Sequence, residues 1–416
     1  MNYCDIIKIS YITVEAEKKS MRNVVIISSD YTGHGHKSIS ESLMEQFNKY
    51  DDVNVNVIDG FELGGNMWVK VGKSYGLVTR NAKELWKLAW KISKRNPAFI
   101  HDFTELTIRE NFIKMIRKLK PDLILSVHPV FNTPILNILK EYKLNIPFAI
   151  FVADLVSISP LWADKRADCI ICPTREAKER CMGFGVPENR LKVIGFPVRS
   201  RFTQHIAENT EKPEYTTDRP LECLIMSGGE GSGDMSSVSR ILLENFNSRI
   251  RIIAGRNEAM KEKLEKALLP QYPGRVEIYG YVTNIQDYML KSDIAFTRGS
   301  PNVMMEAIAC NVPLIITGAL PGQEQENPDF AVNNKLGIYC KELSHLSAIV
   351  DELMKNDAEG LNEIKRAQRD YFDHEASKKI VDECLALARN EVFIFPSEIR
   401  RRRRFLRLRL QSRRSS

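Results

Sequence analysis

Residues 295–327, AFTRGSPNVMMEAIACNVPLIITGALPGQEQEN, carry the strongest structural signal in this chain. They predict an apolar strand that ends near Phe296, a small-residue turn over residues 299–302 and a helix that stops near Asn311. A second apolar strand follows over residues 313–317 and leads into a polar loop. This order of strand, helix and strand is one unit of a parallel α/β sheet. Composition alone is equally compatible with an ordinary unit of this kind that carries a solvated loop.

Both turns of this stretch fall at the carboxyl ends of strands, where parallel sheets bind their ligands. Glu306 lies near the start of the predicted helix, and its carboxylate is suited to accept hydrogen bonds from vicinal hydroxyls. The polar side chains of the following loop would stand across the crevice: Gln323, Glu324, Gln325, Glu326 and Asn327.

The composition is typical of a soluble globular protein with two domains, since the 416 residues are 43% hydrophobic and 27% charged. No apolar run reaches the roughly 18 residues expected of a membrane-spanning helix. Residues 1–20 contain Asp5, Glu15 and Glu17 and do not resemble a secretory signal. The formal charge of +7 depends on nine arginines within residues 400–416, without which it is −2. The basicity therefore belongs to the tail.

The tail and the cysteines each leave alternatives. Cations and leucines in the tail suit an anionic membrane or a nucleic acid, but an incidental disordered terminus is the plainer alternative. Among the eight cysteines, Cys169 and Cys172 have the spacing of a metal-binding pair. They lie in an apolar strand without a histidine or a second pair nearby, which favours buried thiols in a reducing compartment over zinc.

A first buried strand is predicted over residues 22–29, and Asp30-Tyr31-Thr32-Gly33-His34-Gly35-His36 forms a turn that opens a helix. His34 and His36 thus fall where a crevice site is expected. A histidine poised near neutral pH can take a proton from an acceptor hydroxyl, although it can also merely cap the turn. Asp30 can support the charge on His36 or serve as a turn former.

Residues 61–100 contain Trp68, Trp86 and Trp90 among six lysines. Trp86 and Trp90 share one helical face. Aromatic side chains with interleaved lysines suit an interfacial helix on anionic lipid, and they suit an amphipathic core helix equally well.

Further strands are predicted over residues 121–127, 148–152 and 168–173, and Gly195-Phe196-Pro197-Val198 follows the last strand of the first half. Residues 199–220 have the composition of an interdomain linker.

A strand over residues 221–226 runs directly into Ser227-Gly228-Gly229-Glu230-Gly231-Ser232-Gly233. Glycines at this position let backbone N–H groups approach a phosphate. Arg256 lies at the tip of the following strand, where it can neutralise a diphosphate.

These motifs resemble the family of monogalactosyldiacylglycerol synthases and processive diacylglycerol glucosyltransferases, within glycosyltransferase family 28. The resemblance covers about residues 22–385 and rests on the Gly33-His34-Gly35-His36 turn, the Gly195-x-Pro197-Val198 segment, the glycine loop and the PGQExxN pattern of residues 321–327. It implies an α/β GT-B fold, in which two Rossmann-like domains with parallel sheets face a central cleft.

The implied organisation has six segments. They are an N-terminal extension (1–20), an acceptor-side and membrane-side domain (21–198), a linker (199–220), a UDP-sugar-binding domain (221–370), crossover helices (371–399) and an Arg-rich tail (400–416).

The resemblance implies an inverting transfer of galactose or glucose from a UDP-sugar to the 3-hydroxyl of 1,2-diacylglycerol. His36 is the implied general base with Asp30 assisting, and Glu306 holds the ribose. The implied UDP-sugar site comprises Gly228, Gly229, Glu230, Gly231, Arg256, Val282, Ser300, Asn302, Glu306, Gln323, Glu324 and Asn327. The implied acceptor or membrane side comprises His34, Trp68, Trp86, Trp90 and Trp162.

No cofactor or metal is expected beyond the donor, because no Asp-x-Asp motif lies in a suitable place and helix amino ends can stabilise the leaving diphosphate. The expected partners are the UDP-sugar, diacylglycerol and an anionic membrane surface, without nucleic acid. The expected location is the cytoplasm, peripheral on the cytoplasmic face of the membrane.

The sequence departs from the family pattern at a few positions. Val303 replaces a threonine, Ser300 and Pro301 replace two glycines, and Ala153 replaces a threonine. These departures leave the donor open. Three alternatives remain: a nucleotide-sugar epimerase, a glycosyltransferase that uses another lipid or a soluble acceptor, and a non-catalytic relative that binds a membrane or a nucleic acid.

Overall fold

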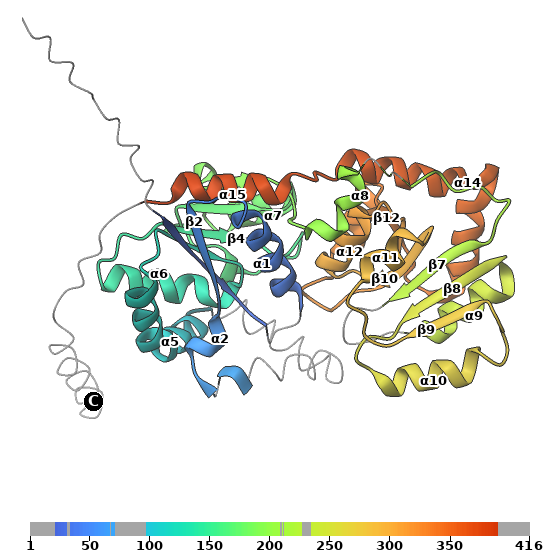
Figure 1. Cartoon of the computed structure of the whole chain (residues 1–416), viewed down its shortest axis with the longest axis horizontal. Helices are drawn as coiled ribbons and strands as arrows, with labels where there is room; N and C mark the ends of the chain where they lie inside the picture. Colours follow the sequence, from blue (N-terminus) through green and yellow to red (C-terminus); the bar gives the residue numbers. More distant parts are fainter. Residues whose placement is uncertain are drawn as a thin grey trace, which may run out of the picture.

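The computed structural model describes residues 21–30, 34–66, 68–70, 97–208, 210, 212–226 and 234–389, without the side chains of His34, Pro97 and Phe99. These residues form two α/β halves that lie side by side (Figure 1). Each half is built on a six-stranded parallel sheet.

The first half contains the sheet β2-β1-β3-β4-β5-β6. Its strands are β1 (Arg22–Ser28), β2 (Val53–Asp59), β3 (Leu123–Ser126), β4 (Phe148–Phe151), β5 (Cys169–Cys172) and β6 (Leu191–Val193). Its helices are α1 (His34–Phe47), α2 (Gly60–Leu63), α5 (Pro97–Leu119), α6 (Asn132–Glu141) and α7 (Arg175–Gly183). The short helix α8 (Gln204–Ala207) follows in the crossing between the halves and lies over the second half (Figure 1). Short 3₁₀ turns cover Pro129–Phe131, Pro160–Trp162, Glu188–Arg190 and Ser200–Phe202. The central strands β3, β4 and β5 are wholly buried, as expected of a parallel sheet with both faces covered.

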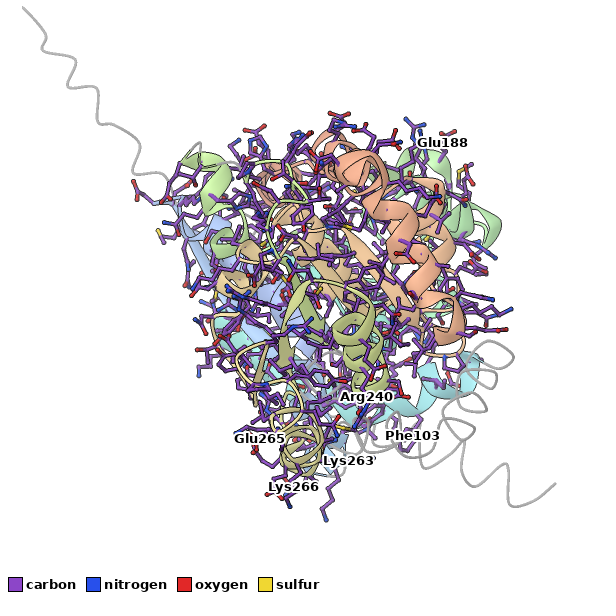
Figure 2. The ribbon with its side chains drawn as sticks, turned by 90° about the vertical axis from the view of Figure 1, so that its right-hand side faces the viewer. Phe103, Glu188, Arg240, Lys263, Glu265 and Lys266 are labelled. Carbon is purple, nitrogen blue, oxygen red and sulfur yellow. The ribbon has the colours of Figure 1, made fainter. Side chains whose placement is uncertain are left out.

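The second half contains the sheet β12-β11-β10-β7-β8-β9. Its strands are β7 (Leu221–Met226), β8 (Ser248–Ile253), β9 (Val276–Tyr279), β10 (Ile294–Arg298), β11 (Leu314–Gly318) and β12 (Gly337–Tyr339). Its helices are α9 (Met235–Asn245), α10 (Glu258–Leu268), α11 (Ile285–Leu290), α12 (Pro301–Ala309), α13 (Asn327–Asn333) and α14 (Leu346–Tyr371), with a 3₁₀ turn over Leu343–His345. Helix α10 is amphipathic: Leu264 and Leu268 are buried, whereas Lys263, Glu265 and Lys266 point outward (Figure 2).

The segment β10-α12-β11 agrees with the strand, helix and strand predicted for residues 295–317. Pro301 occupies the first turn of α12, where its missing N–H costs no helical hydrogen bond. Asn311 adopts a positive φ of 52° directly after the helix and turns the chain towards β11. Helix α12 is buried on most of its surface, because it also contacts α1 and α14. It is therefore one of the elements of the second half that meet the first.

The chain ends its described course on the half where it began. Helix α14 is broken between Lys355 and Ala358, and α15 (Ala376–Leu387) returns along α1 (Figure 1). The hydroxyls of Ser42 and Ser377 are 2.9 Å apart, and α15 buries its apolar face on the first half. The two halves are thus joined by two chain crossings.

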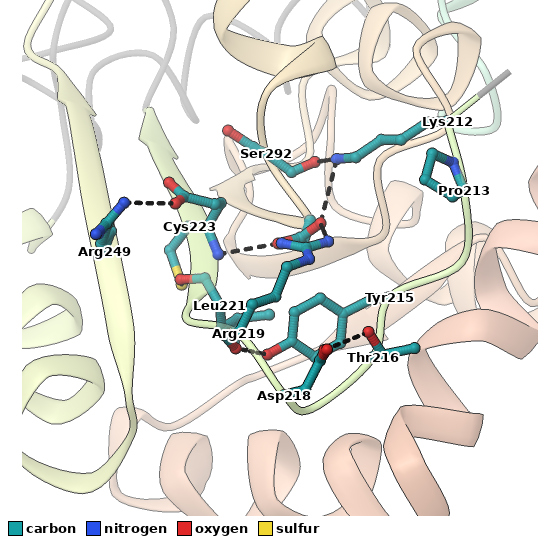
Figure 3. A network of polar contacts seen from close by, with 12 residues as sticks. Lys212, Pro213, Tyr215, Thr216, Asp218, Arg219, Leu221, Cys223, Arg249 and Ser292 are labelled. Atoms are coloured by element: carbon teal, nitrogen blue, oxygen red, sulfur yellow. Dashed lines mark hydrogen bonds and ion pairs between the residues drawn. The ribbon is translucent and has the colours of Figure 1, made fainter. Parts of the chain in front are cut away.

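The first crossing is tied to the second half around the carboxylate of Asp293, which is 1% exposed. Figure 3 shows Lys212, Tyr215 and Arg219 of this network. Arg219 donates to both oxygens of Asp293 at 2.7 and 2.8 Å, and the ammonium of Lys212 lies 3.5 Å from Oδ1. The guanidinium of Arg219 also lies over the ring of Tyr215, 4.6 Å from its centroid. Tyr215 exchanges two backbone hydrogen bonds of 2.9 Å with the side chain of Asn362 on α14. Residues 212–219 are therefore part of the second half's packing.

We expect Asp293→Asn to destabilise the protein by about 3 kcal/mol, because it leaves two cations at a buried site without their counter-charge. The free energy of unfolding in urea measures this loss. Glu110→Gln is the matched control: it breaks an exposed ion pair with Lys114, and we expect a loss below about 1 kcal/mol. Equal effects of the two substitutions would show that the Asp293 network does not stabilise the fold.

Candidate active site

His36 lies in the first turn of α1, directly after β1, and its ring is fixed by the neighbouring strand. Nδ1 is 2.6 Å from the carbonyl oxygen of Val127, which follows β3. Because β1 and β3 pair in parallel, their carboxyl ends meet at one edge of the sheet. The site therefore begins where the strand order predicts a ligand crevice.

The contact with Val127 determines which nitrogen of His36 carries the proton. A carbonyl oxygen only accepts hydrogen bonds, so Nδ1 is the protonated nitrogen and Nε2 carries the lone pair. Burial lowers the pKa of His36 to about 4, although the hydrogen bond to Val127 opposes this shift. The imidazole is thus neutral at physiological pH, with Nε2 able to accept a proton.

A chain of aromatic rings connects His36 to the outer surface of α5. His128 lies 4.5 Å from His36, Phe61 lies 5.4 Å from His128, Trp68 lies 5.5 Å from Phe61, and Phe103 lies 5.7 Å from Trp68, all between ring centroids. His128 is buried, and burial together with the neighbouring His36 lowers its pKa well below the usual value. The ring of His36 therefore lies at one end of a row of largely apolar rings.

The residues predicted on the acceptor side have different positions. Trp162 is fully buried with its ring 6.3 Å from that of His36, and Trp68 is 7% exposed. Neither indole is available to a membrane surface in this structure, because both side chains are buried. Trp86, Trp90 and the side chain of His34 lie outside the described residues.

Asp30 does not contact the ring of His36. Its carboxylate pairs with Lys37 at 3.0 Å, and its backbone N–H donates to Asp59 at 2.6 Å. Both groups of the Asp30–Lys37 pair are substantially exposed. The position expected for Asp30, beside His36, is taken by the carbonyl of Val127.

Glu306 is buried at the contact between the halves. Its Oε1 accepts from the hydroxyl of Ser38 on α1 at 3.0 Å and from the guanidinium of Arg199 at 2.7 Å. Arg199 also donates to Glu41 at 2.9 Å. Because Ser38 is two residues after His36, this carboxylate ties α12 of the second half to the helix that carries His36.

The loop after β11 is held by two of its polar side chains. Glu324 forms an ion pair with Arg298 at 2.9 Å and accepts from the backbone N–H of Leu320 at 2.8 Å. Asn327 donates to the carbonyl of Gly299 at 2.8 Å, which joins the loop to the turn before α12. Gly322 has a φ of 88°, a conformation that favours glycine in this turn.

A third side chain of the loop reaches the first half. Gln323 Nε2 donates to Asp154 Oδ1 at 3.1 Å, and Asp154 Oδ2 accepts from the indole N–H of Trp162 at 2.7 Å. The loop predicted to hold the donor sugar is therefore connected to the half that carries His36.

The remaining predicted donor residues border the same region. A Cβ on Gly35 would lie 2.6 Å from the side-chain nitrogen of Asn302, so a larger residue at position 35 would require the Asn302 side chain to move. Ser300 precedes α12, and the exposed Arg256 lies over the ring of Tyr281 at 4.2 Å. Val282 is partly buried against the core. Gly228, Gly229, Glu230 and Gly231 lie outside the described residues.

Sequence reasoning did not assign three residues that the structure brings to this site: Asp154, His128 and Arg199. The first two follow the ends of β4 and β3, so their strand-end position was the available signal. No local pattern indicates that Arg199 pairs with a glutamate 107 positions later.

Among the residues that the structure describes, no group of three or more histidines, cysteines, aspartates or glutamates is arranged to hold a metal ion. Cys169 and Cys172 are both buried free thiols in β5. Nor is any helix in the described ranges both long and apolar enough to cross a membrane.

Two family models match the sequence. The model described as "Monogalactosyldiacylglycerol (MGDG) synthase" matches residues 36–198, and "Glycosyl transferases group 1" matches residues 236–356. The chain is 28% identical over 398 residues to a chloroplastic monogalactosyldiacylglycerol synthase of Spinacia oleracea, which covers 91% of this chain and 75% of that protein. It is 27% identical over 404 residues to monogalactosyldiacylglycerol synthase 1 of Arabidopsis thaliana, with 91% and 73% covered.

Solved structures agree on the fold. A glycotransferase of kitacinnamycin matches with a TM-score of 0.61 at 12% identity, covering 89% of this chain and all of that one. The MurG structure of Acinetobacter baumannii matches with a TM-score of 0.58 at 14% identity, covering 88% and 99%. The predicted GT-B fold is confirmed.

We expect the two neighbouring histidines to make the protein sensitive to acid. Below pH 6.5 the unfolded chain binds protons that folded His36 and His128 do not, so the free energy of unfolding falls as pH falls. Each histidine contributes at most about 1.4 kcal/mol per pH unit. His128→Asn should retain more of its stability between pH 6.5 and pH 5 than the unsubstituted protein, as measured by urea unfolding at each pH.

The matched control is His374→Asn, which changes an exposed histidine outside this site. Its stability should follow the same pH dependence as the unsubstituted protein. Parallel pH profiles for all three proteins would mean that His128 is protonated without cost in the folded state.

Proposed function

We infer that this chain, which belongs to the monogalactosyldiacylglycerol synthase family of glycosyltransferases, transfers a hexose from a UDP-sugar to diacylglycerol. The names of its relatives support galactose as the sugar and diacylglycerol as the acceptor. The observation that carries the proposal is the neutral His36, whose Nε2 carries the lone pair in a helix bonded to α12 of the second half.

In the proposed step, Nε2 of His36 takes the proton of the acceptor's 3-hydroxyl as its oxygen attacks C1 of the sugar. The new C1–O bond forms while the bond from C1 to the diphosphate oxygen breaks, so UDP leaves and the configuration at C1 inverts. The hydrogen bond from Nδ1 to Val127 keeps the ring in the orientation and tautomer that this transfer needs.

The low pKa of His36 is compatible with this role. A base must be unprotonated to act, and burial ensures this at neutral pH. The negative charge of a bound diphosphate would raise the pKa of the imidazole, because an opposite charge favours the imidazolium. The base would thus become stronger when the donor is in place.

The second half supplies the donor contacts in this proposal. Within the described residues, both hydrogen bonds to Glu306 use Oε1, which leaves Oε2 to accept from a ribose hydroxyl. Arg256 would neutralise the diphosphate, and Gln323 with its loop would hold the sugar. The amino end of α12 adds a favourable dipole for the leaving phosphate.

We also propose that the protein works as a peripheral protein at an anionic membrane, on its cytoplasmic face. The chain of rings from His36 ends at Phe103, which is 43% exposed (Figure 2). Leu106, on the same helix, is 66% exposed. Two large apolar side chains on this side suit contact with a lipid acceptor's membrane.

The test is transfer from labelled UDP-galactose and UDP-glucose to vesicles of phosphatidylglycerol that contain diacylglycerol, with soluble alcohols as alternative acceptors. We expect galactosyl diacylglycerol as the main product. His36→Gln should lower kcat by about 100-fold or more, the usual contribution of a general base. His374→Asn is the matched control and should retain full activity.

Transfer to soluble alcohols alone would favour a different acceptor class. If the intact protein turned over neither UDP-sugar, the proposed reaction would be refuted. If kcat were unchanged in His36→Gln, the assignment of His36 as the base would be refuted.

A further inference from the structure

Asp154 joins the two halves at a position that the general-base mechanism leaves without a role. It lies just beyond the carboxyl end of β4 and is 4% exposed. One carboxylate oxygen accepts from Trp162 at 2.7 Å, and the other accepts from Gln323 at 3.1 Å. The ring of Trp162 is 6.3 Å from that of His36. Asp154 therefore connects the donor-side loop with the surroundings of the base.

The charge of Asp154 determines which end of the Gln323 amide it can bind. Burial raises the pKa of Asp154 to about 6. The hydrogen bonds from Trp162 and Gln323 act in the opposite direction, because they stabilise the carboxylate and lower its pKa. At neutral pH it is mainly a carboxylate, which only accepts hydrogen bonds. The amide must turn its NH₂ group towards Asp154, so its carbonyl oxygen points the other way.

The backbone of the loop is held by other contacts. Glu324 is paired with Arg298, and Asn327 is bonded to Gly299. These contacts lie within the second half and do not involve Asp154. A change at Asp154 should therefore act on the side chain of Gln323 and leave the loop in place.

We propose that Asp154 is a positioning residue: it orients the amide of Gln323 so that the carbonyl oxygen accepts a hydrogen bond from a hydroxyl of the donor sugar. This inference rests on the proposed function. It assigns a recognition role across the cleft, since a residue of the first half sets which hydrogen-bonding group of the second half meets the sugar.

The proposal makes a reciprocal exchange of the two side chains informative. In Asp154→Asn the asparagine has one side-chain oxygen, and this oxygen must accept from the indole N–H of Trp162, which can only donate. The new NH₂ group therefore faces Gln323. The amide of Gln323 then turns over and presents a donor where the sugar needs an acceptor. In Gln323→Glu two carboxylates face each other. In the double variant, the NH₂ group of the asparagine donates to the new glutamate, whose other oxygen is again an acceptor.

We expect each single variant to lower kcat/KM for the UDP-sugar by about tenfold or more, which corresponds to one lost hydrogen bond. Inhibition by UDP, which lacks the sugar, should keep the same constant. The double variant should recover most of the lost kcat/KM. Asp351→Asn, at an exposed aspartate on α14, is the matched control and should behave as the unsubstituted protein.

Thermal unfolding of every variant separates this role from a merely structural one. If the substitutions acted through folding or through closure of the halves, they would weaken UDP binding as well. The loss of kcat/KM in the double variant would then be the sum of the two single losses. The inference would be overturned by an unchanged kcat/KM in Asp154→Asn. It would also be overturned if kcat/KM of the double variant were no higher than that of the less active single variant. Absence of turnover in the unsubstituted protein would instead be a failure of the proposed function.

Discussion

The buried carboxylate of Glu306 is the contact on which the relation between the two halves depends. A charge removed from water must be paired with hydrogen-bond donors or an opposite charge. Glu306 belongs to the second half, and it accepts hydrogen bonds from Ser38 and Arg199, which both precede the second half in the chain. Arg199 is held in turn by Glu41 on α1. These bonds determine where α12 lies against α1. Because the same helix α1 carries His36, they also set the position of the proposed base relative to the second half.

The sequence predicts the elements around this contact well, because their signals are local. The helical spacing of apolar residues, Pro301 at the start and Asn311 at the end define α12 within a few positions. The strand expected over residues 22–29 is β1, Arg22–Ser28. The contacts between the halves are different, since Asp154 and Gln323 are 169 positions apart. Their meeting depends on how two separately patterned sheets pack, which periodicity does not encode.

Two positions show how a sequence pattern leaves the neighbour of a side chain open. Asp30 precedes both His36 and Lys37, and the ammonium, which is charged at neutral pH, takes the carboxylate. The neutral ring is bound instead by the carbonyl of Val127, from a strand distant in sequence. Trp68 lies in a segment rich in lysines, yet its indole is buried between Phe61 and Phe103. Tryptophan with lysine nearby is compatible with a core as well as with a membrane surface, and packing decides between them.

The loop after β11 combines both kinds of constraint. Its backbone is fixed within the second half by Glu324 and Asn327, whereas the amide of Gln323 donates to Asp154 in the first half, which we propose orients it. If the two halves separate, the loop keeps its shape but loses the partner that orients its amide. Recognition of the sugar would then be complete only when the halves are together, which is also when His36 is beside the donor. The same closure would thus couple selection of the sugar to the placement of the base.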